Sequence, residues 1–193
     1  MGFWRFGITL TNGANYLIAM FVICPNNIGP SMKKFFFLIS FFLIGLATFA
    51  QDSLAIYKRF PTVPPFKIIN VQDSSFFKKD DLDKKKITML IIFSPDCDHC
   101  QHATKDLLTN AALFKKVQVV MAAFAPYEMV SKFYNDYGIA QHSNITMGVD
   151  QGYFLGSFYS IKSFPSVFLY NKKGTLIKAF EGLMPFSSIA ASL

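Results

Sequence analysis

Two kinds of hydrophobic pattern alternate along residues 66–193. Residues 87–93 and 117–125 are continuous apolar runs, which are typical of short strands buried on both faces of a sheet. Residues 97–114 and 126–137 place apolar side chains at helical spacing, so each predicts an amphipathic helix. Shorter segments predict strands at 66–71, 144–149 and 166–170, and a short helix at 151–159.

The end of the chain adds a hairpin to this alternation. The turn Asn171-Lys172-Lys173-Gly174 leads into a strand at 175–180, and its glycine can adopt a positive φ. A last short helix is expected after Pro185. Strands that alternate with helices and close in a hairpin predict an α/β fold, in which helices flank a central mixed sheet.

The first fifty residues follow a different pattern. Lys33 and Lys34 precede an apolar run at 35–46, and small residues follow up to Ala50. A basic start, a short apolar run and a small-residue cleavage site are the three parts of a secretory signal peptide, so we expect residues 32–50 to be removed. The run is shorter than the ~20 apolar residues of a membrane-spanning helix, so no span is expected in the mature form. A retained N-terminal membrane anchor is the alternative.

The signal pattern divides the chain into four parts. Residues 1–31 fit no signal pattern and precede the methionine that begins one, so we expect an upstream extension that is not translated. The signal peptide follows. Residues 51–63 contain prolines and predict an extended lead-in, and residues 64–193 form the ordered domain.

Composition and charge narrow the class of protein. Hydrophobic residues make up 52% of the chain and charged residues 16%, which excludes an intrinsically disordered protein. After removal of residues 1–50, 16 basic and 12 acidic residues remain, and this mild excess predicts no nucleic-acid partner. Loss of Cys24 leaves one pair of cysteines, Cys97 and Cys100.

This pair stands at the start of a predicted helix, in the sequence Cys97-Asp98-His99-Cys100. Unpaired backbone N–H groups at a helix start stabilise an anion, which favours the thiolate of Cys97 and lets it attack a disulfide. Cys100, one turn further on, can attack the mixed disulfide and release the substrate. His99 would stabilise the thiolate, whereas Asp96 and Asp98 would oppose it, and the sequence leaves the sign of the sum open.

The segment Phe93-Ser94-Pro95-Asp96-Cys97-Asp98-His99-Cys100, followed about 65 residues later by Ser163-Phe164-Pro165-Ser166, resembles the thioredoxin superfamily. Over residues 64–193 the chain is similar to the exported TlpA-like thiol-disulfide oxidoreductases. The resemblance implies a thioredoxin fold and an enzyme that exchanges disulfides with protein thiols, in the reducing direction. Cys97 is then the nucleophile and Cys100 the resolving thiol. A cis-proline at Pro165, with Phe164, forms the wall on the substrate side.

The resemblance also implies partners and a location. Protein thiols and disulfides are the substrates, and an upstream thiol electron donor returns the pair to its reduced form. No cofactor and no metal are expected. The mature protein is exported, and in a bacterium its location is the periplasm.

Three positions depart from the family pattern. Asp96 stands where the family commonly has a tryptophan, and Ile91 stands where thioredoxins keep a buried carboxylate that accepts the proton of the resolving thiol. Without that base, deprotonation of Cys100 depends on water or on another group. The segment after Gly182 is also short for the last helix of the family.

Two other functions remain open. The domain could be a redox-inert binding module, in which the cysteine pair stays oxidised and the groove near Pro165 docks partners. It could also be a copper or zinc chaperone that uses Cys97, Cys100 and His102, although no second cysteine pair completes a four-ligand site.

Overall fold

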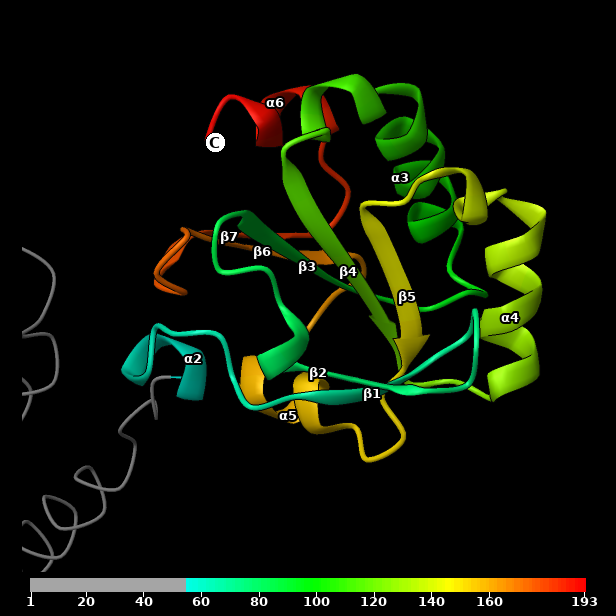
Figure 1. Cartoon of the computed structure of the whole chain (residues 1–193), viewed down its shortest axis with the longest axis horizontal. Helices are drawn as coiled ribbons and strands as arrows, with labels where there is room; N and C mark the ends of the chain where they lie inside the picture. Colours follow the sequence, from blue (N-terminus) through cyan, green and yellow to red (C-terminus); the bar gives the residue numbers. More distant parts are fainter. Residues whose placement is uncertain (1–54) are drawn as a thin grey trace, which may run out of the picture. The chain divides into compact units, whose positions relative to one another are not determined.

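The computed structural model describes residues 55–193 (Figure 1). The predicted upstream extension, the signal peptide and the first residues of the lead-in lie outside the described residues. No helix of the described part is long and apolar enough to cross a membrane.

A seven-stranded sheet forms the centre of the domain, in the order β2-β1-β5-β4-β3-β6-β7. β3, β4 and β5 run parallel, and antiparallel strands flank them on both sides, so the predicted mixed sheet is confirmed. The strands are β1 (Lys67–Asn70), β2 (Phe76–Lys78), β3 (Ile87–Phe93), β4 (Val117–Ala123), β5 (Ile145–Val149), β6 (Ser166–Tyr170) and β7 (Leu176–Glu181).

Helices cover both faces of the sheet (Figure 1). One face packs against α3 (Asp98–Thr109), α4 (Tyr127–Asp136) and α6 (Phe186–Ala190), with the short 3-10 turns η2 (Ala111–Phe114) and η3 (Ile139–Gln141). The other face packs against α2 (Ile56–Arg59) and α5 (Phe154–Tyr159). A further 3-10 turn, η1 (Lys79–Asp81), follows β2.

The central strands serve two separate cores, which explains their continuous apolar sequence. On β3, Ile91 and Phe93 point into the core under α3, whereas Leu90 and Ile92 point into the core over α5. Successive side chains of a strand point to opposite faces of the sheet. When both faces are covered, every position is buried, so each position favours an apolar residue. The prediction that β3 and β4 are buried on both faces is therefore confirmed.

Two predicted helices have different ends in the structure, because local hydrogen bonds end or start them. α3 ends at Thr109, since the side-chain amide of Asn110 donates to the backbone carbonyl of Asp106 at 2.9 Å. α5 begins at Phe154 rather than 151, since the carboxylate of Asp150 accepts the N–H groups of Phe154 and Leu155 at 3.1 and 2.7 Å.

The lead-in is not extended throughout, so this prediction is wrong at Ile56–Arg59, where the chain forms the short helix α2. Tyr57 on this helix is buried, and its ring contacts Phe168 edge to face at 5.3 Å between centroids. A helix of four residues is unstable by itself, so this tertiary contact stabilises it. β2 has no counterpart among the predicted strands, because three residues are too few to show an alternating pattern.

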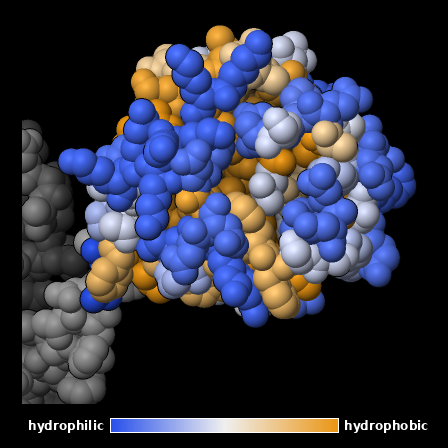
Figure 2. Space-filling view, in the orientation of Figure 1, coloured by the Kyte–Doolittle hydropathy of each residue, from blue (hydrophilic) through white to orange (hydrophobic). Residues whose placement is uncertain are grey.

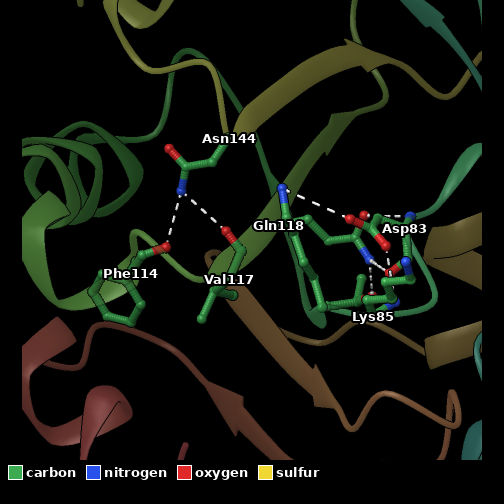
Figure 3. Close-up of polar contacts among 8 residues, drawn as sticks. Asp83, Lys85, Phe114, Val117, Gln118 and Asn144 are labelled. Atoms are coloured by element: carbon green, nitrogen blue, oxygen red, sulfur yellow. Dashed lines mark hydrogen bonds and ion pairs between the residues drawn. The ribbon is translucent and has the colours of Figure 1, made fainter.

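Two side-chain amides tie loops to the sheet at the end where β3 and β4 begin (Figure 3). Gln118 on β4 accepts the N–H of Asp83 at 2.9 Å and donates to the carbonyl of Asp83 at 2.9 Å. Asn144, just before β5, donates both its amide hydrogens to backbone carbonyls, those of Phe114 and Val117, each at 3.0 Å. These amides satisfy backbone groups that no neighbouring strand reaches.

Candidate active site

The two cysteines lie where β3 passes into α3. The strand ends at Phe93, a tight turn follows, and Cys97 caps the helix with extended backbone angles. The carbonyl of Cys97 accepts the N–H groups of Cys100 and Gln101 at 2.9 and 3.0 Å. This closes the first turn of the helix, so the two thiols lie one turn apart, and both are free.

The two thiols differ in exposure. Cys97 is half-buried, whereas Cys100 is only 1% exposed and belongs to the core under α3. Burial raises the pKa of Cys100 from 9.0 to about 12, and the neighbouring Cys97 and the charge of Asp96 act in the same direction. A backbone hydrogen bond from Ser94 opposes this shift without cancelling it. At neutral pH the second thiol therefore keeps its proton.

The three residues expected to tune the first thiol are close to Cys97 in the sequence and face the solvent. Asp96, Asp98 and His99 are all exposed. The carboxylate of Asp96 accepts a short hydrogen bond from the hydroxyl of Ser94, which holds it on the turn before Cys97. The turn is held from the helix as well, because the side chain of Gln101 donates to the carbonyl of Pro95 at 3.1 Å.

Phe164 and Pro165 lie at the same edge of the sheet. Ser166, the first residue of β6, pairs with Ile92 near the end of β3, so the segment before it lies beside the cysteine turn. The peptide bond between Phe164 and Pro165 is cis, as the resemblance implied. Pro165 is buried, whereas Phe164 is half-buried and, like Cys97, packs against the core under α3.

Ile91 occupies the position of the carboxylate that thioredoxins keep under the active site. It is only 2% exposed and lies in the same core as Cys100. Among the described residues the one buried acidic residue is Asp150, and its carboxylate accepts the N–H groups of Phe154 and Leu155 at the start of α5. Deprotonation of Cys100 therefore depends on a group outside this core, and Asp96 is the carboxylate that affects its pKa.

Two exposed aromatic residues stand at the same edge, and the sequence analysis missed both. The strand predicted at 117–125 ends at Ala123, and Phe124 beyond it is 58% exposed. Its ring contacts that of Tyr153, which has a positive φ of 51°, at 5.1 Å between centroids. The signal for Phe124 was the proline two residues later, which disfavours continued strand pairing.

Two further histidines lie outside the Cys97-Asp98-His99-Cys100 segment. His102 is exposed on α3, and His142 is half-buried beyond η3. Among residues 55–193, no group of three or more histidine, cysteine or acidic side chains could hold a metal ion.

Comparison with known families decides the classification. A family profile for a thioredoxin-like domain matches residues 78–193, which is more than half of the chain. The chain belongs to the thioredoxin-like family. Membership of this family supports an oxidoreductase activity. No curated protein matches the sequence of this thioredoxin-like chain.

Solved structures share the fold of this thioredoxin-like protein at low sequence identity. A secreted Mycobacterium tuberculosis disulfide oxidoreductase homologous to E. coli DsbE is 20% identical, with a TM-score of 0.57 over 66% of this chain and 93% of the other. M. tuberculosis DsbF is 20% identical, with a TM-score of 0.57 over 68% and 96%. The exposed lipoprotein thioredoxin Etrx1 of Streptococcus pneumoniae is 21% identical, with a TM-score of 0.52 over 67% and 100%. The predicted thioredoxin fold is therefore confirmed.

Proposed function

We propose that this protein is an exported thiol-disulfide oxidoreductase that exchanges disulfides with protein thiols through Cys97 and Cys100. One observation carries the proposal: two free cysteines share the first turn of a 12-residue helix, the first half-buried and the second buried. A two-step exchange needs this asymmetry, because a substrate disulfide must reach the first sulfur while the second attacks only from within.

The reduced pair reacts in two steps. The thiolate of Cys97 attacks one sulfur of a client disulfide, so a bond forms to Cys97 and the other client sulfur leaves as a thiolate. Cys100 then loses its proton and attacks the sulfur of Cys97, which forms the intramolecular disulfide and releases the second client thiolate. The client gains two electrons, and an upstream thiol donor reduces the oxidised pair again.

The other site residues support these two steps. The backbone N–H groups at the start of α3 favour negative charge at Cys97. Phe164 and Pro165 form the wall against which an extended client segment lies. His99, Asp96 and Asp98 adjust the stability of the thiolate from the exposed side.

The reducing direction is part of the proposal. An oxidant of this fold is strong because its reduced form is stabilised by a thiolate. The thiolate of this pair would form on Cys97, and the carboxylate of Asp96 on the preceding residue disfavours a negative charge there. Asp98 adds a second carboxylate next to Cys97. The two carboxylates therefore favour a cysteine pair that acts as a reductant.

Export and a periplasmic location belong to the same proposal. They rest on the signal pattern of residues 32–50, with Met32 as the translation start. Sequencing the N-terminus of the protein from cells that express the complete sequence tests the cleavage site and the translation start. A mature chain that begins at Gln51 is expected, and an N-terminus at Met1 would contradict the assignment.

Turnover tests the chemistry. Protein purified after expression of the complete sequence is incubated with insulin as the disulfide client and dithiothreitol as the donor. We expect Cys97→Ser to fall to the uncatalysed rate and Cys100→Ser to accumulate the mixed disulfide. His102→Ala, on the exposed side of the same helix, is the matched control and should keep normal turnover. A wild-type protein without turnover would instead favour the redox-inert binding module.

The reduction potential tests the direction separately. Equilibration of the pair in glutathione buffers should give a value closer to that of thioredoxin, about −270 mV, than to the about −120 mV of a strong oxidant with this fold. A value near the oxidant would reverse the proposed direction and leave the exchange chemistry intact.

A further inference from the structure

Basic residues gather at one end of the sheet, opposite the cysteines. The turns that precede β3 and β4 and the turn that follows β6 all lie at this end, because Ile87 pairs with Val117 and Thr88 pairs with Tyr170. The segment after α2 joins them, since Thr62 pairs with Thr175. The basic side chains carried by these segments, here called the basic pole, are Lys58, Arg59, Lys84, Lys85, Lys86, Lys115, Lys116, Lys172 and Lys173.

The basic pole is exposed and poorly neutralised. All nine residues are exposed, and of these nine, within the described part of the chain, only Lys86 has an ion-pair partner, Asp83 at 3.9 Å. The carboxylates nearest the Lys84-Lys85-Lys86 run in the sequence are those of Asp80, Asp81 and Asp83, all three on exposed residues. Hydrophilic side chains cover this part of the described surface, at the left of the view in Figure 2. Nine cations against these three carboxylates leave the pole with a net positive charge.

Acidic residues favour the opposite end. Asp96 and Asp98 follow β3, Glu128 lies in the first turn of α4, and Asp150 follows β5. Lys67 and Lys162 lie at that end as well, so its charge is mixed, whereas the basic pole is mainly positive. The seven residues of β3, which separate the two ends, span about 20 Å. This difference between the two ends is not apparent from the net charge of the sequence.

We propose that the basic pole docks the domain on an anionic lipid surface. The cations come from four separate segments, and neither of the two grooves found in the described part is lined by them. All but one of them are lysines, which act as point charges rather than as paired donors for a shaped ligand. A broad layer of lysines matches a layer of lipid phosphates, which attracts each cation near its surface.

The entry of the chain supports a membrane as the occupant. The described chain begins at Ala55, next to Lys58 and Arg59 of the pole. Eight residues lie between Leu46, the end of the apolar run, and Ala55, so an extended chain from one to the other spans at most about 30 Å. Before the signal peptide is removed, a membrane that holds this run is therefore within reach of the basic pole. Docking by the pole would leave Cys97 facing away from the membrane.

Vesicle binding tests the proposal. Protein from the complete sequence is sedimented with vesicles of phosphatidylcholine alone and with vesicles that also contain an equal amount of phosphatidylglycerol. The pole variant carries Lys84→Gln, Lys115→Gln and Lys172→Gln, one change in each turn. The control variant carries Lys79→Gln, Lys105→Gln and Lys132→Gln, which remove the same charge from exposed positions outside the pole.

We expect the wild type to bind the anionic vesicles more strongly than the neutral ones, with a dependence on salt. The pole variant should bind the anionic vesicles at least about tenfold more weakly, and the control variant should stay within about twofold of the wild type. Insulin reduction by both variants should be unchanged, which shows that they are folded. Equal losses in the two variants, or no preference for anionic vesicles, would overturn the proposal. Binding of duplex DNA that depends on the same three lysines would reassign the pole to nucleic acid.

Discussion

The carboxylate of Asp106 on α3 accepts the backbone N–H of Phe186, the first residue of α6, at 2.6 Å. Its other oxygen accepts the side-chain amide of Asn110 at 2.9 Å. A helix of five residues such as α6 has little stability of its own. One carboxylate thus holds the last helix on the helix that carries the cysteines.

Asp106→Ala should therefore lower the free energy of unfolding by about 1–3 kcal/mol, because the N–H of Phe186 loses its partner in a partly buried position. Asp106→Asn keeps an acceptor oxygen and should lose less. Urea denaturation of both variants measures the difference. Two variants of wild-type stability would show that the contact contributes nothing.

The raised pKa of Cys100 makes the stability of the reduced protein depend on pH. Above about pH 9 the thiol ionises in the unfolded chain, whereas in the folded chain it keeps its proton up to about pH 12. The unfolded chain then binds fewer protons, so stability is fully present below pH 9 and falls as the pH rises towards 12, by at most about 1.4 kcal/mol per pH unit.

Cys100→Ala provides the control for this slope. Burial also raises the pKa of Tyr170, to about 12, but this contribution is the same in both proteins. The difference between reduced wild type and variant in urea titrations across this pH range isolates the thiol. Parallel curves would mean that Cys100 is not buried in the folded protein.

Gly148 on β5 has no room for a side chain. A Cβ atom at this position would lie 2.5 Å from the carbonyl oxygen of Ile69 on the neighbouring β1, and that atom belongs to the backbone. Gly148→Ala should cost about 1–3 kcal/mol or more, since the β1 and β5 strands must move apart. Gly152→Ala, where nothing lies within 4 Å, should change stability by less than about 0.5 kcal/mol. Thermal unfolding compares the two.

Asn144→Asp should be strongly destabilising, because the new carboxylate cannot donate and faces the carbonyls of Phe114 and Val117. We expect a loss of about 2–3 kcal/mol at neutral pH. Acidification should return part of it, since a protonated carboxyl regains one donor. Asn135→Asp, the same change at an exposed position of α4, is the control and should stay within about 0.5 kcal/mol. Equal stability of the two variants would contradict the bridging role of Asn144.

Much of the fold was predictable because its elements depend on local pattern. β3 and β4 appear as continuous apolar runs, since strands covered on both faces cannot show a polar alternation. The turn before β7 was also visible, because Gly174 has a positive φ of 76° that its residue type allows. The position of the cysteine pair at the start of a helix was also predictable, because the apolar spacing that follows it is a local pattern.

Other elements depend on contacts between distant residues and left no local signal. α2 exists because Tyr57 packs on Phe168, more than 100 residues away in the chain. The exposure of Phe124 depends on where pairing between β4 and β5 ends. Neither this pairing nor the strand order can be predicted from the residues of a single segment. Short elements of this kind are stabilised by the tertiary structure that surrounds them.

The candidate site divides in the same way. The amino-acid sequence alone determined the chemistry available to the protein, since residue type decides which atoms can become nucleophiles and two residues of spacing put both thiols on one helical turn. Only the tertiary structure decided that Cys100 is buried while Cys97 is reachable, and that lysines from separate turns form one charged end. Burial and surface charge arise from which segments meet in space, and that depends on the packing of the whole domain.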